Sequence, residues 1–291
     1  MKNFLYSNYG IKVDKIYKND KEMFFFCNNE KIHIRKNNDI NHLNMLYELT
    51  NYLYSHHIPT YTFIHNNKNK PYTHLNKNEV VLLKENNNND YVSLNTLNMY
   101  RNIKTKLYNY NIFIEWSNEV DLIEKELMEY NKEYPLIQES IDYFIGLAEN
   151  AIELIGNFKN MIDANNNSIG HIVDYNLLNN MSINDPFTFI KTNIMFDYAN
   201  YIKYKYVLNE IDYNELDSIF NSLSEYESIY LLSCLIYPST YFSLVKSILL
   251  KKEEEEKLIF IIKKIDNYNQ LLLFCKSRVK SKVISNLLSW I

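Results

Sequence analysis

Residues Tyr143–Ile155 read YFIGLAENAIELI, and apolar side chains recur along this stretch at intervals of three and four residues. This spacing predicts an amphipathic helix that buries one face in a hydrophobic core. Gly146 lies inside the predicted helix, where glycine costs about 1 kcal/mol relative to alanine. We therefore expect Gly146 to sit at a close packing contact.

Most of the chain around this stretch also has helical periodicity. The helix that contains Gly146 is expected to span residues 136–162, after Pro135 has ended the helix before it. Ser224 is a suitable N-cap for a long helix that bends near Pro238. The other predicted helices are Ser93–Tyr108, Glu119–Glu133 (capped by Ser117 or Asn118), Ile194–Val207, Tyr213–Leu223 and a C-terminal pair.

The beginning of the chain is instead rich in strand patterns. Lys21–Cys27 and Lys31–Arg35 are short runs joined through Asn28-Asn29, which predicts a β-hairpin. Asp39 or Asn41 can cap a following helix that reaches about His57. Two further strands are expected at residues 60–64 and 79–83.

The order of these elements predicts an α+β protein with two lobes. A strand-rich N-lobe with one helix would occupy residues 1–90, ending near the Asn86–Asn89 run, and a helical C-lobe would occupy residues 91–291. This layout is that of a protein kinase or of an aminoglycoside- or choline-kinase-like protein.

Composition narrows the classes of function. The chain has 291 residues, 46% of them hydrophobic, and can bury a sizeable core. The net charge of −4 argues against non-specific binding of nucleic acid, which requires a basic surface. The most apolar run, Tyr230–Val245, is interrupted by Pro238 and hydroxyl residues, so no membrane span is expected. The polar N-terminus lacks a secretory pattern, which indicates synthesis in the cytoplasm.

The three cysteines are Cys27, Cys234 and Cys275. They are widely separated and odd in number, which favours reduced thiols over a disulfide framework or a zinc cluster. We expect no metal site built from them.

Four segments carry a resemblance to a known family. They are Trp116–Lys125 (WSNEVDLIEK), Gly146–Ile152, Asp185–Ile202 and Leu231–Leu244 (LLSCLIYPSTYFSL). Together they resemble the spore-coat kinase-like proteins of endospore-forming bacteria, the YutH-type branch of the CotS family. The resemblance implies a protein-kinase-like fold of the aminoglycoside/choline-kinase type. It also implies synthesis during sporulation, a location in the spore coat or at the forespore surface, and other spore-coat proteins as partners.

Two features of an active phosphotransferase are weak in the first lobe. Gly10 is the only glycine before Gly146, so no glycine-rich loop can cradle the phosphates of a nucleotide. Arg35 stands about where a strand lysine would bind phosphate, and it is the one candidate for nucleotide binding. The alternative interpretation is an edge-strand arginine in water. Glu48 on the following helix is a candidate ion-pair partner for Arg35.

The segment His171–Asn179 reads HIVDYNLLN and resembles the catalytic loop His-Gly-Asp-x-His-x-x-Asn of aminoglycoside-kinase-like enzymes. Alignment on Asp174 retains the catalytic base, and Asn179 then falls five residues later, where a metal-binding Asn belongs. His171 is one residue out of place in this alignment. The resemblance therefore gives Asp174, Asn179 and His171 as degenerate catalytic positions.

Phe187–Ile202 resembles the strand, turn and helix that carry the metal-binding aspartate in the family. Thr192 stands at the place of that aspartate, whereas Asp197 and Ala199 agree with the family pattern. A neutral threonine binds Mg²⁺ far more weakly than a carboxylate does. We expect Asp197 to be a structural hydrogen-bond acceptor near a helix start.

These losses predict a catalytically inactive, kinase-like component of the spore coat that needs no cofactor. Two alternatives remain open. One is an active small-molecule phosphotransferase that uses Mg·ATP with Asp174 and Asn179. The other is a nucleotide-free binding module that uses the cleft between the lobes.

Overall fold

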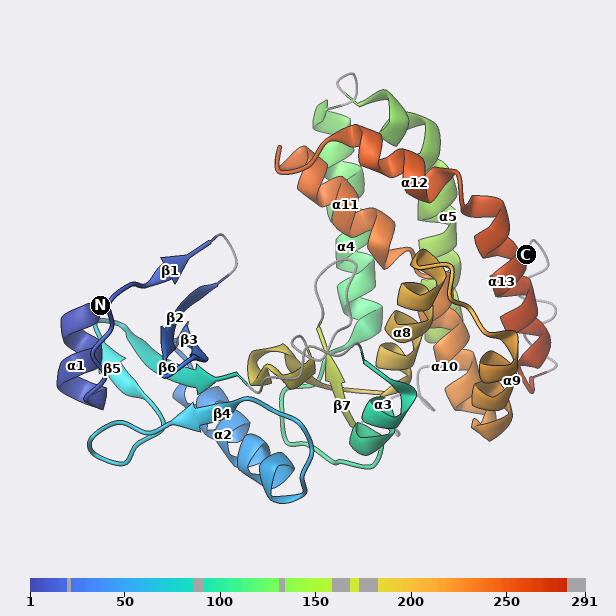
Figure 1. The fold of residues 1–291 in the computed structure, drawn as a ribbon. Coiled ribbons are helices and arrows are strands. Elements are labelled where there is room, and N and C mark those ends of the chain that lie inside the picture. The colour runs from blue at the N-terminus through green and yellow to red at the C-terminus, as the bar shows by residue number, and fades with distance from the viewer. Residues whose placement is uncertain (20–21, 86–91, 131–133, 159–167, 173–182, 282–291) are drawn as a thin grey trace. The chain divides into compact units, whose positions relative to one another are not determined.

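The computed structural model describes residues 1–19, 22–85, 92–130, 134–158, 168–172 and 183–281 (Figure 1). They form two compact units. The sheet unit contains the described residues of 1–108 and of 171–190, and the helical unit contains those of 109–170 and of 191–291. The sheet unit is therefore built from two separate stretches of chain. The division into an N-lobe of residues 1–90 and a C-lobe of residues 91–291 stays a prediction.

The sheet unit contains a six-stranded sheet with the order β1-β2-β3-β6-β4, and β5 pairs with β6. All of the pairings are antiparallel. Asn28 and Asn29 both have positive φ angles, 52° and 63°, which fits the turn that a two-residue hairpin needs and confirms the predicted hairpin. The strands are β1 (Tyr17–Lys18), β2 (Met23–Cys27), β3 (Glu30–Asn37), β4 (Thr62–Ile64), β5 (Thr73–Leu75) and β6 (Asn78–Lys84).

The two faces of this sheet carry different side chains. Leu5 and Tyr9 of α1 (Lys2–Tyr9) pack on the face that contains Ile32 and Ile34. Because side chains alternate along a strand, His33 and Arg35 of β3 belong to the opposite face. On that face α2 (Ile40–Ser55) packs its Tyr47 edge-on against Phe63 of β4.

The helix α2 begins where the sequence predicts. The Asp39 side chain accepts a hydrogen bond from the His42 N–H at 3.0 Å, as an N-cap does. The next predicted helix is wrong in its second half, because α3 (Leu94–Tyr100) stops eight residues before Tyr108. The Thr105 hydroxyl accepts from the Leu107 N–H at 3.2 Å, a local bond that competes with helix formation.

The helical unit is organised around α10 (Glu225–Ile236), in which every residue from Ser228 to Ile236 is buried. This helix packs against α5 (Pro135–Asn157), α8 (Met195–Val207) and α13 (Ile265–Arg278) (Figure 1). The remaining elements here are α4 (Ile112–Tyr130), α9 (Tyr213–Ser222), α11 (Ser239–Leu249), the 3-10 turn Glu255–Lys257 and α12 (Leu258–Ile262). The short strands β7 (Ser168–His171) and β8 (Phe189–Thr192) pair with each other, and the turn Pro186–Thr188 precedes β8.

Prolines lie at the ends of helices in this unit. Pro135 was expected to end one helix but instead begins the next. Pro135 is the first residue of α5, where its missing N–H has no cost. The preceding helix α4 begins at Ile112, seven residues before the predicted start, because Ile112 and Trp116 are buried. Pro238 separates α10 from α11, as the predicted bend requires.

The Ser224 cap is confirmed as a full capping box. The Ser224 side chain accepts from the Glu227 N–H, and the Glu227 carboxylate accepts from the Ser224 N–H at 2.9 Å. Within the described residues, Glu225–Leu249 is the one stretch long and apolar enough to cross a membrane, and 83% of its most apolar window is buried inside the structure. That burial is typical of a core helix.

The expectation for Gly146 is wrong. A Cβ atom at this position would meet no atom of the described residues outside its own stretch of helix within 4 Å, so no close contact among them explains the glycine. The close approach occurs instead at Gly170 in β7, where a Cβ would lie 2.3 Å from Thr192 Cγ2 on the paired strand β8. A helical pattern locates a glycine on a helix but does not show which neighbour faces it.

Candidate functional site

Arg35 lies on β3, which is an interior strand between β2 and β6. The interpretation of Arg35 as an edge-strand residue in water is therefore wrong. Its Nη2 donates to Asp185 Oδ2 at 2.6 Å, and the side chain is 22% exposed. Glu48, the suggested partner, is exposed on α2. Arg35 is thus a half-buried cation that an acid 150 residues later in the chain already neutralises.

Asp185 is held in place by its own turn. Its Oδ1 accepts from the Phe187 N–H at 3.0 Å and caps the turn Pro186–Thr188, so both carboxylate oxygens are used. The carbonyl of the preceding residue, Asn184, accepts from the Tyr61 N–H at 2.8 Å. The pair with Arg35 is consequently a fixed part of the sheet unit.

His33 lies two residues before Arg35 on the same face of β3 and is 2% exposed. Its Nε2 is 2.9 Å from Glu85 Oε2, and its Nδ1 is 3.0 Å from Glu22 Oε2. Lys31 Nζ lies 3.4 Å from a carboxylate oxygen of each glutamate. Burial raises the pKa of Glu85, but the His33 hydrogen bond and the Lys31 charge outweigh it and leave that pKa lowered.

The ring of Tyr61 stacks on the ring of His33 on this face of the sheet. The two rings are stacked at 5.2 Å between centroids and 14° between planes, and Tyr61 is 2% exposed. Burial raises the pKa of Tyr61, so its hydroxyl stays neutral. The face of the sheet that carries Arg35 therefore also carries an aromatic ring, an imidazole and two carboxylates.

Of the predicted degenerate catalytic positions, the structure describes His171 and Thr192. Asp174 and Asn179 lie outside the described residues. His171 ends β7, is fully buried, and packs edge-on against Tyr100 at 4.9 Å and Phe189 at 5.2 Å. The His171 ring thus lies in an aromatic part of the core of the sheet unit.

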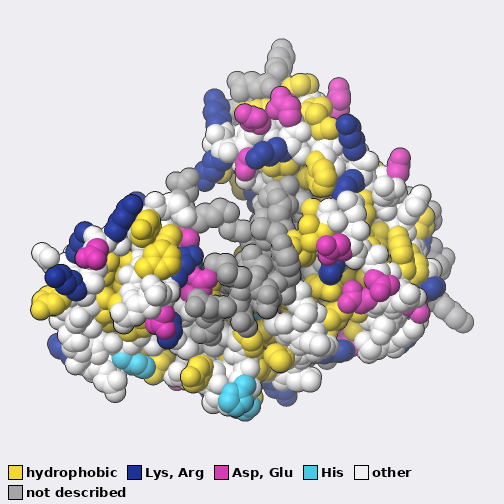
Figure 2. Space-filling model, in the orientation of Figure 1, with side chains coloured by type: hydrophobic (Ala, Val, Ile, Leu, Met, Phe, Trp, Pro, Cys, Tyr) yellow, Lys and Arg dark blue, Asp and Glu magenta, His cyan; other side chains and the backbone are white. Residues whose placement is uncertain are grey.

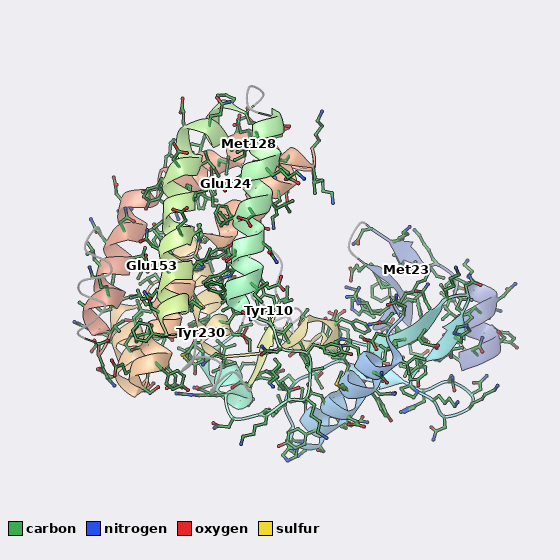
Figure 3. All side chains as sticks on the ribbon, turned by 180° about the vertical axis from the view of Figure 1, so that it is seen from behind. Met23, Tyr110, Glu124, Met128, Glu153 and Tyr230 are labelled. Carbon is green, nitrogen blue, oxygen red and sulfur yellow. The ribbon has the colours of Figure 1, made fainter. Side chains whose placement is uncertain are left out.

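Thr192 is the last residue of β8 and is fully buried. Its Oγ1 is 3.2 Å from the Tyr230 hydroxyl, and its methyl group contacts Gly170. Burial, with smaller effects of Cys234, Tyr110 and Asp197, raises the pKa of Tyr230, which leaves a neutral hydroxyl pair. Tyr110 and Tyr230 lie toward the same end of the helical unit, where α4 begins (Figure 3).

Asp197 is fully buried in the first turn of α8, where the helix dipole favours a negative charge. The structural role expected for it stays a prediction. Among the described residues, no group of three or more His, Cys, Asp or Glu side chains could hold a metal ion. Thr192, for which the resemblance predicts the place of the metal-binding aspartate, supplies a neutral hydroxyl, which is a poor ligand for Mg²⁺.

A family model described as "Spore coat putative kinase YutH" matches residues 115–272, more than half of the chain. The chain belongs to this family. The matched region of this YutH-family chain begins in α4 and ends in α13, so it lies mainly on the helical unit. No curated protein matches the sequence.

Solved structures show the fold of this YutH-family chain. An aminoglycoside phosphotransferase from Alicyclobacillus acidocaldarius superposes with a TM-score of 0.69 at 9% sequence identity, covering 96% of each chain. A spectinomycin phosphotransferase, solved with ADP and spectinomycin, superposes with a TM-score of 0.55 at 11% identity, covering 95% of this chain and 97% of the other. The fold is that of the aminoglycoside phosphotransferases, as the sequence predicts.

Sequence reasoning missed most of the polar residues around Arg35. The alternation His33-x-Arg35 was a usable signal, because it places both side chains on one face. Nothing in the sequence identifies Asp185 or Glu85 as partners, because both pairings depend on long-range contacts.

Charge on the surface of this YutH-family chain is mixed. On the face drawn in Figure 2, Lys and Arg side chains are interspersed with Asp and Glu. A nucleic-acid-binding surface would instead gather its basic residues into a patch.

Proposed function

We propose that this protein is a catalytically inactive, kinase-like protein and a structural or interaction component of the bacterial spore coat. Membership of the spore-coat kinase family and the phosphotransferase fold support the coat and kinase-like parts of the proposal. The observation that carries the inactive part is Thr192, which is buried and neutral where the family resemblance predicts a metal-binding aspartate.

Phosphoryl transfer depends on metal ions and fixed cations that stabilise the charge on the transferred group. A hydroxyl in place of the carboxylate removes the anionic oxygen that Mg²⁺ requires. The lack of a glycine-rich loop before residue 146 removes the second usual contact to the phosphates.

The neighbourhood of Arg35 supports the same proposal. A phosphate that bound Arg35 would have to displace Asp185, whose oxygens also cap a turn. It would also approach a face that carries Glu22 and Glu85, and two carboxylates there repel an anionic ligand.

The rival function is an active small-molecule phosphotransferase. It rests on the spacing of Asp174 and Asn179 in the sequence, which matches a catalytic base followed by a metal-binding Asn. Such an enzyme would need a metal site that uses Asn179 without the second carboxylate.

Thermal stability with Mg·ATP and with Mn·ATP separates the two functions. A ligand at a hundred times its dissociation constant stabilises the fold by about 2.7 kcal/mol. We expect neither nucleotide–metal mixture to shift the midpoint of thermal unfolding of this protein. The spectinomycin phosphotransferase, which should show such a shift, is the positive control. A shift that disappears in both Asp174→Ala and Asn179→Ala would overturn the proposal and establish the rival function.

The coat role is tested in a spore-forming strain that lacks this protein. We expect the wild-type chain and an Asp174→Ala/Asn179→Ala double variant to restore coat assembly equally, because the proposed role needs no catalysis. Restoration by the wild type alone, with equal amounts of the two proteins present, would contradict an inactive scaffold.

A further inference from the structure

The helical unit contains an apolar pocket between α5, α8, α11, α12 and α13. Its cavity volume is about 80 Å³, and the pocket opens to solvent on one side. The wall is formed largely by aromatic and aliphatic side chains, including Tyr143, Phe144, Leu147, Tyr206, Phe260 and Tyr268. None of the residues discussed above as degenerate catalytic positions lies in this wall.

The tyrosines of this wall offer ring surface rather than free hydroxyls. Tyr206 donates to the Lys264 carbonyl at 2.7 Å, and Tyr268 donates to the Leu235 carbonyl at 2.6 Å. Tyr143 donates to Asn269 Oδ1 at 2.7 Å. A ligand in the pocket would therefore contact aromatic faces, which favours an apolar body.

Lys203 of α8 is a charged group in this apolar wall. Its Nζ donates to the Tyr237 carbonyl at 2.7 Å and to Ser239 Oγ at 3.1 Å, and both acceptors belong to pocket residues. An ammonium has three N–H donors, so one remains available. Within the described chain Lys203 forms no ion pair with a carboxylate, and burial lowers its pKa to about 8.

Lys264 adds a second positive charge to the same wall. Its Nζ lies 4.4 Å from the centroid of the Phe260 ring and 5.5 Å from that of Tyr206. It donates to the Val207 carbonyl at 3.1 Å and to Asn209 Oδ1 at 2.9 Å, both of them neutral acceptors. The pocket thus has two ammonium groups and, among the described residues that line it, no carboxylate.

We propose that this pocket binds a monocarboxylate with an apolar body, whose carboxylate accepts the free N–H of Lys203 and whose body lies on the aromatic rings. Glu119 of α4 acts on Lys203 electrostatically but forms its ion pair with Lys246, so an anionic ligand would give the buried Lys203 amine a counter-charge in direct contact. The largely apolar wall suits a singly charged carboxylate better than a phosphate of nearly two charges, because desolvating the larger charge costs more. This site is independent of nucleotide binding and of the proposed coat function.

Binding is measured by calorimetry on the full chain with octanoate and phenylacetate as probes, which distinguish an aliphatic from an aromatic body. The matched neutral controls are octanamide and phenylacetamide. We expect at least one acid to bind about tenfold or more tightly than its amide, because charge-assisted hydrogen bonds are the stronger ones. Equal binding of both acids and their amides, or no binding of either acid, would overturn the proposal.

Variants then locate the site. Lys203→Met should abolish the preference for the acid, whereas Lys205→Met, on the same helix but paired with Glu210 at 3.1 Å, should leave it unchanged. Thr240→Trp places a large side chain in the pocket and should abolish binding of acid and amide alike. Unchanged binding in a folded Lys203→Met protein would refute the site. If that variant does not fold, unchanged binding in Thr240→Trp would refute it instead.

The pH dependence gives a further readout of Lys203. The amine is faced by Cys234 of α10 and Glu119 of α4, and by Tyr237 and Lys264 in the wall. Burial raises the pKa of Cys234 and of Tyr237, so neither becomes charged when the Lys203 amine loses its proton. The preference for the acid should decrease as the pH rises above about 8, and a preference that persists well above that pH would contradict the role of Lys203.

Discussion

Gly146 and Gly170 differ in the room that their surroundings leave for a side chain. Gly146 is half-buried on α5, and beyond its own helix an added Cβ would touch none of the residues that the structure describes within 4 Å. Gly170 on β7 faces the Thr192 methyl group, and an added Cβ would overlap it at 2.3 Å. Gly146 therefore lowers the stability of its helix without a packing benefit, whereas Gly170 is required for β7 to pair closely with β8.

Gly146→Ala should stabilise the protein by about 1 kcal/mol, because alanine restricts the unfolded chain and has a better helix propensity. Gly170→Ala should destabilise it by about 1–3 kcal/mol through overpacking. Urea unfolding measures both changes.

The cause of the Gly170 effect is checked by removing the methyl group that it meets. Thr192→Ser keeps the hydroxyl near Tyr230, so the Gly170→Ala/Thr192→Ser double variant should recover much of the lost stability. Strict additivity of the two substitutions would show that these residues do not touch.

Lys203 should make stability depend on pH in a defined window. Its folded-state pKa of about 8 is below its ordinary value of 10.5, so the unfolded chain binds the proton more tightly between these two values. Stability must then rise with pH from about 8 to about 10.5, by up to about 3 kcal/mol and by less where solvent reaches the amine.

The Lys203→Met protein isolates this effect, because other titrating groups cancel in the comparison. We expect the stability difference, wild type minus variant, to increase across that window in urea titrations at several pH values. A difference that is flat or decreases with pH would contradict a desolvated amine.

At the scale of elements, Glu119 of α4 bonds both to the residue between α10 and α11 and to a lysine of α11. Glu119 accepts from the Tyr237 hydroxyl at 2.5 Å and from Lys246 Nζ. Trp116, one helical turn earlier on α4, stacks on the Tyr237 ring at 4.0 Å and 2°. The residue that precedes Pro238 is thus held from two sides by α4.

Glu119→Gln should cost about 1 kcal/mol, because the amide oxygen still accepts from Tyr237 while the ion pair with Lys246 is lost. Glu119→Ala should cost about 2–3 kcal/mol, because the Tyr237 hydroxyl also loses its acceptor in a buried place. The exposed Glu124 of the same helix, shown in Figure 3, is the control.

In denaturant unfolding, the loss in free energy of unfolding should therefore be near zero for Glu124→Gln, larger for Glu119→Gln and largest for Glu119→Ala. An equal cost for both Glu119 variants would mean that the Tyr237 hydrogen bond contributes nothing to stability.

Sequence patterns predicted those elements whose ends depend on local chemistry. The Asn28-Asn29 hairpin, the Asp39 cap and the Ser224 capping box each rely on residues within a few positions of one another. The start of α4 was missed because burial of Trp116 against Tyr237 determines it, and that contact is long-range.

The same distinction applies to the candidate site. The shared face of His33 and Arg35 follows from strand alternation, and the threonine at the metal position follows from family resemblance. The Asp185 partner and the Tyr61 ring could not be predicted, since they approach β3 only in the folded chain.

At the scale of the whole molecule, the buried tyrosines make the stability of the fold depend on pH. The chain has 26 tyrosines, and burial raises the pKa of several, including Tyr61, Tyr230, Tyr237 and Tyr268. A raised folded-state pKa means that the stability from these groups is complete below about pH 10 and is lost above it, as the unfolded chain ionises first.

We therefore expect cooperative unfolding above about pH 10, with tyrosinate absorbance appearing together with the loss of helical circular dichroism. Tyr230→Phe removes one such group and should reduce the steepness of the pH dependence. Tyrosinate absorbance that develops fully before the helices unfold would contradict the burial of these side chains.

The discontinuous sheet unit has a consequence for folding on the ribosome. Arg35 and the Tyr61 N–H find their partners, Asp185 and the Asn184 carbonyl, only after more than 120 further residues have been synthesised. At about 5–20 residues per second, a nascent chain holds these groups unpaired for several seconds while α4 and α5 emerge. The N-terminal strands therefore gain these two contacts only after the turn at Asp185 has been synthesised.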